Sequence, residues 1–366
     1  MPLRPTHKRA VLAGLATLAS AGSLALSLAP ANATGLPGAE RAAAGGTVKV
    51  DTNIRFAGLG TAANTLTISG FGPDRFLLTD RTPIKVGTGC TIQTVGGGLF
   101  GAVCRAPVND EGEFQRVLVD LGAGNDTVTQ HAPASLHAQG GDGDDTIVGG
   151  SLDDDLFDRA GANTLRGRSG DDYLDTSISD DVLKDVLDGG RGDDQLFAGP
   201  SSDSLVGATG DDDMQGGLGA DTFDGGSGRD HVSYTDSAHG GKRNFVTFDG
   251  VANDGDSPLS GTKEGDNVLD TVEDATGNSG TDFFFGDDDD NHFVGLGGND
   301  FLEGGDGEDR LEGMSGADQI FGDQFLGSIH DGDVDVLDGG TDATDTCRAS
   351  TIDPDQTLAC EVVDNT

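Results

Sequence analysis

Glycine and aspartate recur in this chain at a nine-residue spacing that could bind cations. The clearest copy, residues 140–148, reads Gly-Gly-Asp-Gly-Asp-Asp-Thr-Ile-Val, with an acidic sixth residue and an apolar eighth residue. Hard divalent cations bind about six to eight oxygen ligands, drawn from carboxylates and from backbone carbonyls. The pattern therefore predicts a series of oxygen-lined cation sites along the chain.

The copies keep one phase through three blocks of the chain. Fourteen of them begin at residues 140, 149, 158, 167, 189, 198, 207, 216, 225, 277, 286, 295, 304 and 313. The eighth position is apolar in all of them, which chance would produce with a probability on the order of 10⁻⁷ at this composition. The sixth position is asparagine at Asn163 and Asn291 and aspartate elsewhere. We predict these aspartates as metal ligands: Asp145, Asp154, Asp172, Asp194, Asp203, Asp212, Asp221, Asp230, Asp282, Asp300, Asp309 and Asp318.

A turn of six residues followed by a strand of three must position these groups. Such a unit points only its eighth side chain into the interior between two parallel sheets. It therefore predicts an all-β fold, a right-handed parallel β-roll or β-helix solenoid with a small N-terminal β cap region. Stacked coils lie ~4.8 Å apart, and ionised carboxylates at that spacing repel each other. Ca²⁺ tolerates a mixed cage of carbonyls and carboxylates better than Mg²⁺ does. We expect calcium binding and folding to be one event.

The Gly-Gly-x-Gly-x-Asp copies resemble the haemolysin-type calcium-binding repeat (RTX) family of secreted bacterial proteins. The resemblance implies that each ion lies between turns two repeats apart, with several Ca²⁺ ions, up to about eight, in the uninterrupted blocks. The copies that begin at Asp158 and Ala198 lack part of the glycine pattern, so sites there are the least expected. The resemblance also implies carbonyl ligands from these glycines: Gly141, Gly143, Gly190, Gly192, Gly217, Gly219, Gly226, Gly228, Gly305 and Gly307.

The N-terminal residues have the pattern of a secretory signal peptide. Three basic residues, Arg4, Lys8 and Arg9, precede an apolar stretch over residues 10–28 and a small-residue cleavage site at residues 31–33. A transmembrane anchor is the alternative, but this stretch is diluted by Ala, Gly and Ser and no stop-transfer charge follows it. We expect a signal peptide at residues 1–33 and a secreted, extracellular or cell-surface-associated protein.

The charge of the chain limits its partners. It holds 64 acidic and 22 basic residues, and three of the basic residues lie within the expected signal peptide. Nucleic acid and anionic lipid are poor partners for such a surface, and we expect no membrane insertion. Calcium ions are the expected ligands, and the sequence identifies no protein or surface partner.

We expect no enzyme. Ser227 lies in Gly-Gly-Ser-Gly-Arg, which breaks the G-x-S-x-G nucleophile motif, and no H-E-x-x-H metal motif occurs. With no Trp and two Tyr, an aromatic platform for a glycosidase is hard to assemble. The leading hypothesis is a non-catalytic calcium-binding solenoid. The alternative is a calcium-rigidified adhesion or extracellular-matrix spacer that recognises a partner through an insert or the N-terminal region.

Four cysteines and three interruptions of the repeat set the expected domain organisation. Three disulfide connectivities are open, and the two local pairs are favoured because each would staple a separate segment; four reduced thiols are the other alternative. Within the inserts, Asp185 and Leu187 recover the repeat positions, and strands are expected at residues 244–248 and 267–272. The expected parts are an N-terminal β region at 34–120 with Cys90–Cys104, a β-roll at 121–340 with inserts at 176–188, 234–276 and 322–338, and a C-terminal cap at 341–366 with Cys347–Cys360.

Overall fold

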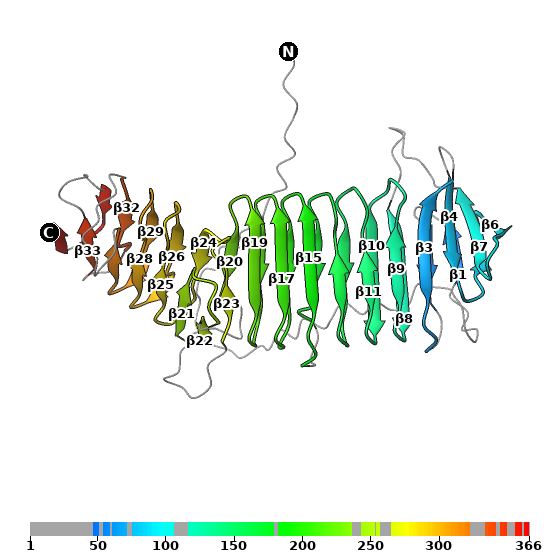
Figure 1. Ribbon diagram of the computed structural model, residues 1–366, viewed down its shortest axis with the longest axis horizontal. Coiled ribbons are helices and arrows are strands. Elements are labelled where there is room, and N and C mark those ends of the chain that lie inside the picture. The colour runs from blue at the N-terminus through cyan, green and yellow to red at the C-terminus, as the bar shows by residue number, and fades with distance from the viewer. Residues whose placement is uncertain are drawn as a thin grey trace, which may run out of the picture. The chain divides into compact units, whose positions relative to one another are not determined.

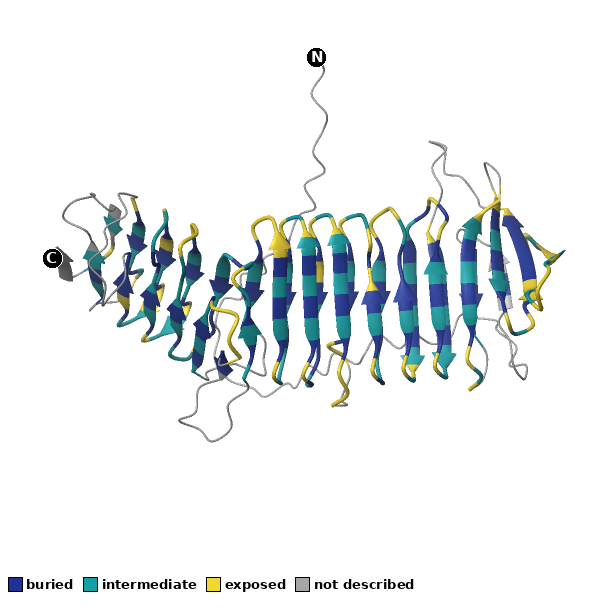
Figure 2. Cartoon of the chain, in the orientation of Figure 1, coloured by how far each residue is buried: buried dark blue, intermediate teal, exposed yellow. Residues whose placement is uncertain are grey.

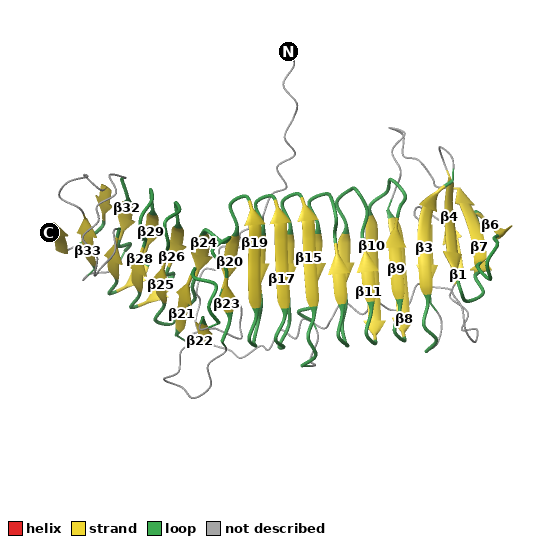
Figure 3. Ribbon diagram, viewed as in Figure 1, coloured by secondary structure: helices red, strands yellow, loops and turns green. Residues whose placement is uncertain are grey.

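A computed structural model describes the chain over residues 47–50, 54–58, 61–71, 75–105, 116–178, 182–235, 243–252, 254–256, 265–322, 334–341, 345–349, 356–360 and 362–365. The expected signal peptide lies outside these residues. Every regular element within them is a strand (Figure 3). Among the same residues no helix is long and apolar enough to cross a membrane.

One long sheet forms one wall of the fold and two shorter sheets form the opposite wall (Figure 1). The first sheet contains, in spatial order, β34 (Gln356–Leu358), β32 (Val336–Asp338), β29 (Arg310–Glu312), β26 (His292–Val294), β24 (Asp274–Thr276), β20 (His231–Ser233), β18 (Asp213–Gln215), β16 (Gln195–Phe197), β14 (Tyr173–Asp175), β12 (Asp155–Phe157), β10 (Leu136–Asp142), β8 (Val117–Ala123), β2 (Ile54–Ala57), β1 (Thr47–Val50) and β5 (Lys85–Val86).

The second and third sheets divide the opposite wall between them. The second contains β23 (Asn267–Val268), β19 (Thr222–Ser227), β17 (Ser204–Thr209), β15 (Val186–Arg191), β13 (Thr164–Arg166), β11 (Thr146–Val148), β9 (Thr127–Gln130), β3 (Thr65–Gly70), β4 (Arg75–Asp80), β7 (Phe100–Arg105) and β6 (Cys90–Thr94). The third contains β22 (Gly255–Asp256), β21 (Asn244–Thr247), β25 (Phe283–Phe285), β28 (Phe301–Glu303), β31 (Gln319–Phe321), β33 (Thr346–Ala349) and β35 (Val362–Asn365), and a short fourth sheet pairs β27 (Gly297–Gly298) with β30 (Ser315–Gly316).

The strands of the repeats pair in parallel with the strand two repeats away. Ile147 pairs with Leu165 in the second sheet, and Leu156 pairs with Leu174 in the first. Each coil therefore contributes one strand to each wall, and coils stack in register. The predicted parallel β-solenoid is confirmed.

The core is a narrow column between the two walls. The eighth-position side chains of all fourteen copies are buried, and Leu187 and Leu337 occupy the same column. Figure 2 shows the resulting alternation of buried and intermediate residues along the strands. The sixth position is buried as well, from Asp145 to Asp318, and its carboxylates bond to the backbone of the neighbouring coil.

The inserts continue the solenoid. The strands expected at residues 244–248 and 267–272 are present as β21 and the shorter β23. β23 ends the second sheet by pairing with β19, whereas β21 belongs to the third sheet and pairs with β25. The pairing of β20 with β24 keeps the first sheet continuous across this change.

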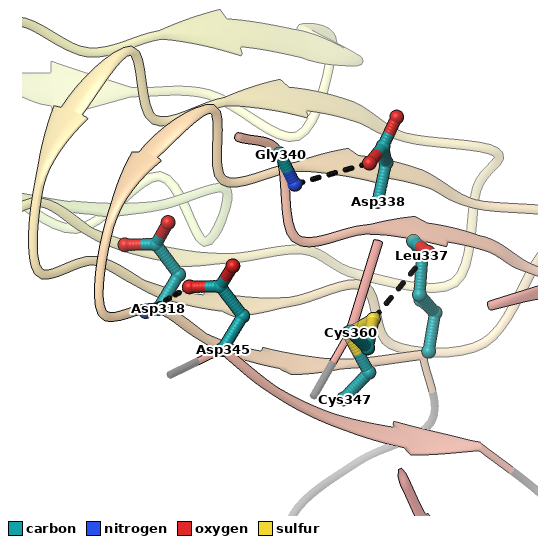
Figure 4. The surroundings of a disulfide bond; sticks show 7 residues. All are labelled: Asp318, Leu337, Asp338, Gly340, Asp345, Cys347 and Cys360. Carbon is teal, nitrogen blue, oxygen red and sulfur yellow. Dashed lines mark hydrogen bonds between the residues drawn. A yellow bond between two sulfur atoms is a disulfide. The ribbon is translucent and has the colours of Figure 1, made fainter. Parts of the chain in front are cut away.

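Disulfides lie near both ends of the described solenoid. Cys90 of β6 and Cys104 of β7 face each other in an antiparallel pair and are disulfide-bonded. Cys347 is buried, pairs with Ile320 and is bonded to Cys360 (Figure 4). Both local pairs were the favoured connectivity.

Several turns leave no room for a side chain at their fourth position, which is glycine in eleven of the fourteen copies. Gly316 has a φ of 150°, and a Cβ there would overlap the carbonyl oxygen of Gly298 in the neighbouring coil. We expect Gly316→Ala to lower the free energy of unfolding in calcium by about 2–3 kcal/mol, since it adds backbone strain to a backbone clash. A Cβ on Gly96 meets nothing within 4 Å, so Gly96→Ala should change it by about 0.5 kcal/mol at most. Urea denaturation measures both, and equal losses would contradict the expectation.

The second position of the repeat holds strained residues. Arg168, Ala208, Leu296 and Met314 stand at this position with φ between 71° and 84°, a region that costs an L-residue about 1–2 kcal/mol. We expect Ala208→Gly to raise the free energy of unfolding by about 0.5–1 kcal/mol, after the conformational entropy cost of glycine is subtracted. Ala198→Gly, at a buried position without positive φ, should lower it by a similar amount. A gain in both variants, or in neither, would count against this strain.

Candidate metal-binding turns

The sixth-position carboxylates form ladders that run from coil to coil. One carboxylate oxygen, Oδ1, accepts a hydrogen bond from the backbone N–H of the equivalent residue in the preceding coil. The N–H of Asp172 donates to Asp194 at 2.7 Å, that of Asp194 to Asp212 at 2.8 Å, and that of Asp212 to Asp230 at 2.9 Å. All twelve predicted aspartates are buried. The ladder fixes one oxygen of each carboxylate and turns the other toward the first residue of the same turn.

The second oxygen, Oδ2, is left unpaired in many of these aspartates. Among the described residues it has no hydrogen-bond partner in Asp145, Asp172, Asp194, Asp212, Asp230 and Asp300. A buried carboxylate oxygen without a partner is costly. The row of such oxygens is what a bound cation would satisfy, so these residues fit Ca²⁺.

Burial makes the ionised form of these carboxyls unfavourable. It raises the pKa of Asp145 and Asp172 to about 7 and that of Asp194 and Asp300 to about 8, from 3.8. The negative charge of neighbouring aspartates raises each pKa further, while the backbone hydrogen bond lowers it. Without a cation, these groups favour protonation near neutral pH.

The predicted glycine ligands divide into two kinds. All ten have positive φ. Gly141, Gly190 and Gly226 lie within strands β10, β15 and β19, and the carbonyl of Gly141 already accepts a hydrogen bond from Ala160 at 3.2 Å. The other seven lie in turns, namely Gly143, Gly192, Gly217, Gly219, Gly228, Gly305 and Gly307.

Fourth-position carbonyls offer open oxygen atoms between coils. In the described part of the chain, no donor is hydrogen-bonded to the carbonyl oxygens of Gly143 or Gly192. Each lies directly against the fourth-position glycine of the next coil, Gly161 and Gly210 respectively. These carbonyls and the Oδ2 atoms are the oxygens available for a shared ion.

Strand register brings the expected turn pairs together and adds another. The copies at 140 and 158, 149 and 167, and 189 and 207 stack as predicted. The first insert does not break the row, because Tyr173 pairs with Gln195 and the ladder runs from Asp172 to Asp194. The turns beginning at 167 and 189 are therefore neighbours as well.

Several members of the row were missed by the repeat frame. Asp266, Asp335 and Asp345 are buried and accept ladder hydrogen bonds from Asp221, Asp309 and Asp318; Figure 4 shows the last of these. Each is followed two residues later by an apolar core residue. That Asp-x-apolar spacing was a signal that could have found them.

A second ladder on the surface was also missed. The fifth-position aspartates bond in the opposite direction, since the N–H of Asp171 donates to Asp153 at 3.2 Å, that of Asp193 to Asp171 at 3.1 Å, and that of Asp211 to Asp193 at 3.0 Å. These carboxylates are exposed. Their hydrogen bonds join neighbouring turns at the surface, and those of the sixth-position row join the same turns in the interior.

One pair of turns has few oxygens left for an ion. Arg168 Nη1 donates to the carbonyls of Gln130 at 3.1 Å and Gly149 at 3.2 Å. Both oxygens of Asp154 are also bonded, to the N–H groups of Leu136 and Gly150. An arginine thus occupies carbonyl oxygens beside the turns that begin at 149 and 167.

Side chains alone do not make the sites. Within the described ranges, no group of three or more His, Cys, Asp and Glu side chains could hold a metal ion. A zinc site would need such a group, whereas calcium sites commonly include backbone carbonyls.

Comparison with family models identifies RTX calcium-binding nonapeptide repeats in residues 137–156, 148–183, 184–205, 197–232, 276–311 and 294–325. These matches cover most of the stacked turns described above. A search of curated proteins finds no match.

Proposed function

We propose that this chain, a β-solenoid of RTX calcium-binding nonapeptide repeats, is a secreted, non-catalytic protein whose stacked turns bind several Ca²⁺ ions and fold on binding. The observation that carries the proposal is the row of buried sixth-position carboxylates with an unpaired Oδ2 atom, such as Asp172, Asp194 and Asp212. Several such oxygens at successive coils form a repeated donor set for a hard cation.

Each part of the turn has a separate task in this function. The Oδ1 ladder orients the carboxylates, and the fourth-position glycines let carbonyl oxygens approach the next coil. A bound Ca²⁺ ion supplies positive charge that offsets the desolvation and mutual repulsion of these groups. Because the unfolded chain lacks this arrangement, the binding free energy becomes folding free energy.

A calcium titration of residues 34–366 with intact disulfides tests the proposal. We expect a cooperative gain of far-ultraviolet β circular dichroism between chelator and ~10 mM calcium, with several ions bound per chain by calorimetry. Magnesium at the same concentration should give a smaller gain. A chain that keeps its full β signal in chelator and binds no calcium would overturn the proposal.

The proposed secretion of the chain and its proposed lack of catalytic activity need separate tests. Secretion predicts that the protein in the culture medium begins at residue 34, which N-terminal sequencing checks. The chain should also show no activity in a broad hydrolase screen with millimolar calcium. Retention of residues 1–33, or reproducible turnover in that screen, would contradict the respective part.

A further inference from the structure

One copy of the repeat moves its acidic residue from the sixth position to the first. Asp158 stands where twelve other copies have glycine and one has alanine, and the sixth residue of the same copy is Asn163 rather than aspartate. By the repeat pattern alone this coil should lack a carboxylate ligand. The structure gives a different result.

Asp158 is fully buried and points into the space between coils. Its Oδ1 accepts hydrogen bonds from the N–H groups of Gly141 at 3.0 Å and Arg159 at 2.8 Å. Its Oδ2 is buried and has no hydrogen-bond partner among the described residues. The carboxylate is therefore held by one oxygen while the other remains available, as at the sixth positions.

The available oxygen of Asp158 lies beside that of Asp145 in the preceding coil. A Cβ on Gly140 would overlap both Oδ2 atoms at once, so the two oxygens flank one point and lie less than ~5 Å apart, a separation that one Ca²⁺ ion spans with bonds of ~2.3–2.6 Å. Asp145 Oδ2 is also buried and unpaired. Two buried, unpaired carboxylate oxygens therefore converge across the coil interface.

Asn163 offers no open oxygen of this kind. Its Oδ1 accepts the N–H of Asp145 at 3.0 Å, and its Nδ2 donates to the carbonyl of Gly161 at 3.2 Å. The asparagine thus preserves the ladder without contributing charge. The carboxylate that the sixth position lacks is supplied by the first position.

The geometry points to a cation site between Asp145 and Asp158 in which the second turn supplies its carboxylate from the first position of the nonapeptide instead of the sixth. This inference rests on the proposed function, because it concerns a further calcium ion in the same solenoid. It restores a site between the turns that begin at 140 and 158, one of those least expected from the sequence. The carbonyl of Gly143 borders the same pair of turns.

The number of calcium ions bound per chain tests this site. In equilibrium dialysis against labelled calcium, Asp158→Asn should bind one ion fewer than the unsubstituted chain. Asp142→Asn, the same change at an exposed residue of the neighbouring coil, should bind the full number. The exchange Asp158→Gly with Asn163→Asp returns the carboxylate to the sixth position and should also bind the full number.

Other outcomes separate this inference from the proposed function. If Asp158→Asn binds the full number of ions, the two carboxyls share a proton instead of an ion and the site is overturned. If Asp158→Asn does not fold, Asp158→Gly removes the side chain and creates the residue of most other copies, and its loss of one ion, or retention of all, decides in the same way. If the unsubstituted chain binds no calcium, the proposed function itself fails.

Discussion

The folded chain should respond to acid in opposite directions with and without calcium. In chelator, lowering the pH from about 8 to about 5 should increase the folded fraction. With calcium bound, the same change should decrease it. The reason is that the same buried carboxyls take up either protons or the cation.

The sign follows from the raised pKa values of the calcium-free fold. Burial raises the pKa of Asp145 to about 7 and those of Asp194 and Asp300 to about 8, whereas 3.8 is their ordinary value. Between these limits the folded chain binds more protons than the unfolded chain. Its free energy of unfolding therefore rises as the pH falls from about 8 toward about 4. In calcium, protons displace the ion from those oxygens, so the stabilisation that calcium supplies is lost over the same range.

Circular dichroism at a series of pH values, in a pH-insensitive chelator and in ~10 mM calcium, measures both slopes. At each pH where urea unfolds the chain completely, the unfolded fraction gives the free energy of unfolding. Parallel slopes in the two conditions would contradict a shared set of carboxyls. A calcium-free chain that unfolds further on acidification to about pH 5 would show that the aspartates are stabilised as anions.

The periodic part of this fold was predictable because one nine-residue spacing sets both the buried apolar positions and the acidic positions of the repeats. The apolar residue at the eighth position of each nine-residue repeat predicted the core column, and Leu187 continues this column through the first insert. Aspartate at the sixth position predicted the carboxylate row. The sequence did not show that this row is buried and bonded by Oδ1, because the direction of a short polar side chain depends on the stacked backbone.

The ends of the row show where periodicity stops being informative. Asp80 comes from an antiparallel strand of the N-terminal region, yet it is fully buried and accepts the N–H of Thr65 at 3.2 Å. Asp126, at the first coil, is bonded in turn by Asn64. Asp80 lies outside the nine-residue period, so the sequence does not align it with the row. Only the pairing of β3 with β4 and β9 places these residues along one edge.

Residues that depart from the repeat pattern have roles in the fold that the motif alone does not predict. The copy that begins at Asp158 counted as lacking part of the glycine pattern, and Arg168 stands at a second position that is glycine in seven of the fourteen copies. In the fold, Asp158 adds a buried carboxylate while Arg168 donates to two carbonyls. Neither effect follows from residue type alone, since both depend on which oxygens the adjacent coil presents.

A single neutralised carboxylate in the middle of the row should have a large and calcium-dependent effect. Asp194 lies between Asp172 and Asp212, to which the ladder joins it, so an ion on either side would lose a ligand in Asp194→Asn. Each ion contributes about 2.7 kcal/mol at a calcium concentration 100-fold above its dissociation constant. We expect the variant to lose about 5 kcal/mol of unfolding free energy in calcium. In chelator near pH 8 it should instead be more stable than the unsubstituted chain, because a buried charge is gone.

Asp193→Asn is the matched control, with the same chemical change one residue earlier. Asp193 is exposed and accepts the N–H of Asp211 at 3.0 Å, a role that asparagine retains, so its effect should stay within about 0.5 kcal/mol in both conditions. Urea denaturation of the three proteins, with and without calcium, gives the comparison. Equal losses in the two variants would mean that surface charge governs stability. A loss confined to Asp194→Asn but present in chelator too would assign this carboxylate to the hydrogen-bond ladder alone, because only an ion ligand changes the sign of its effect when calcium is removed.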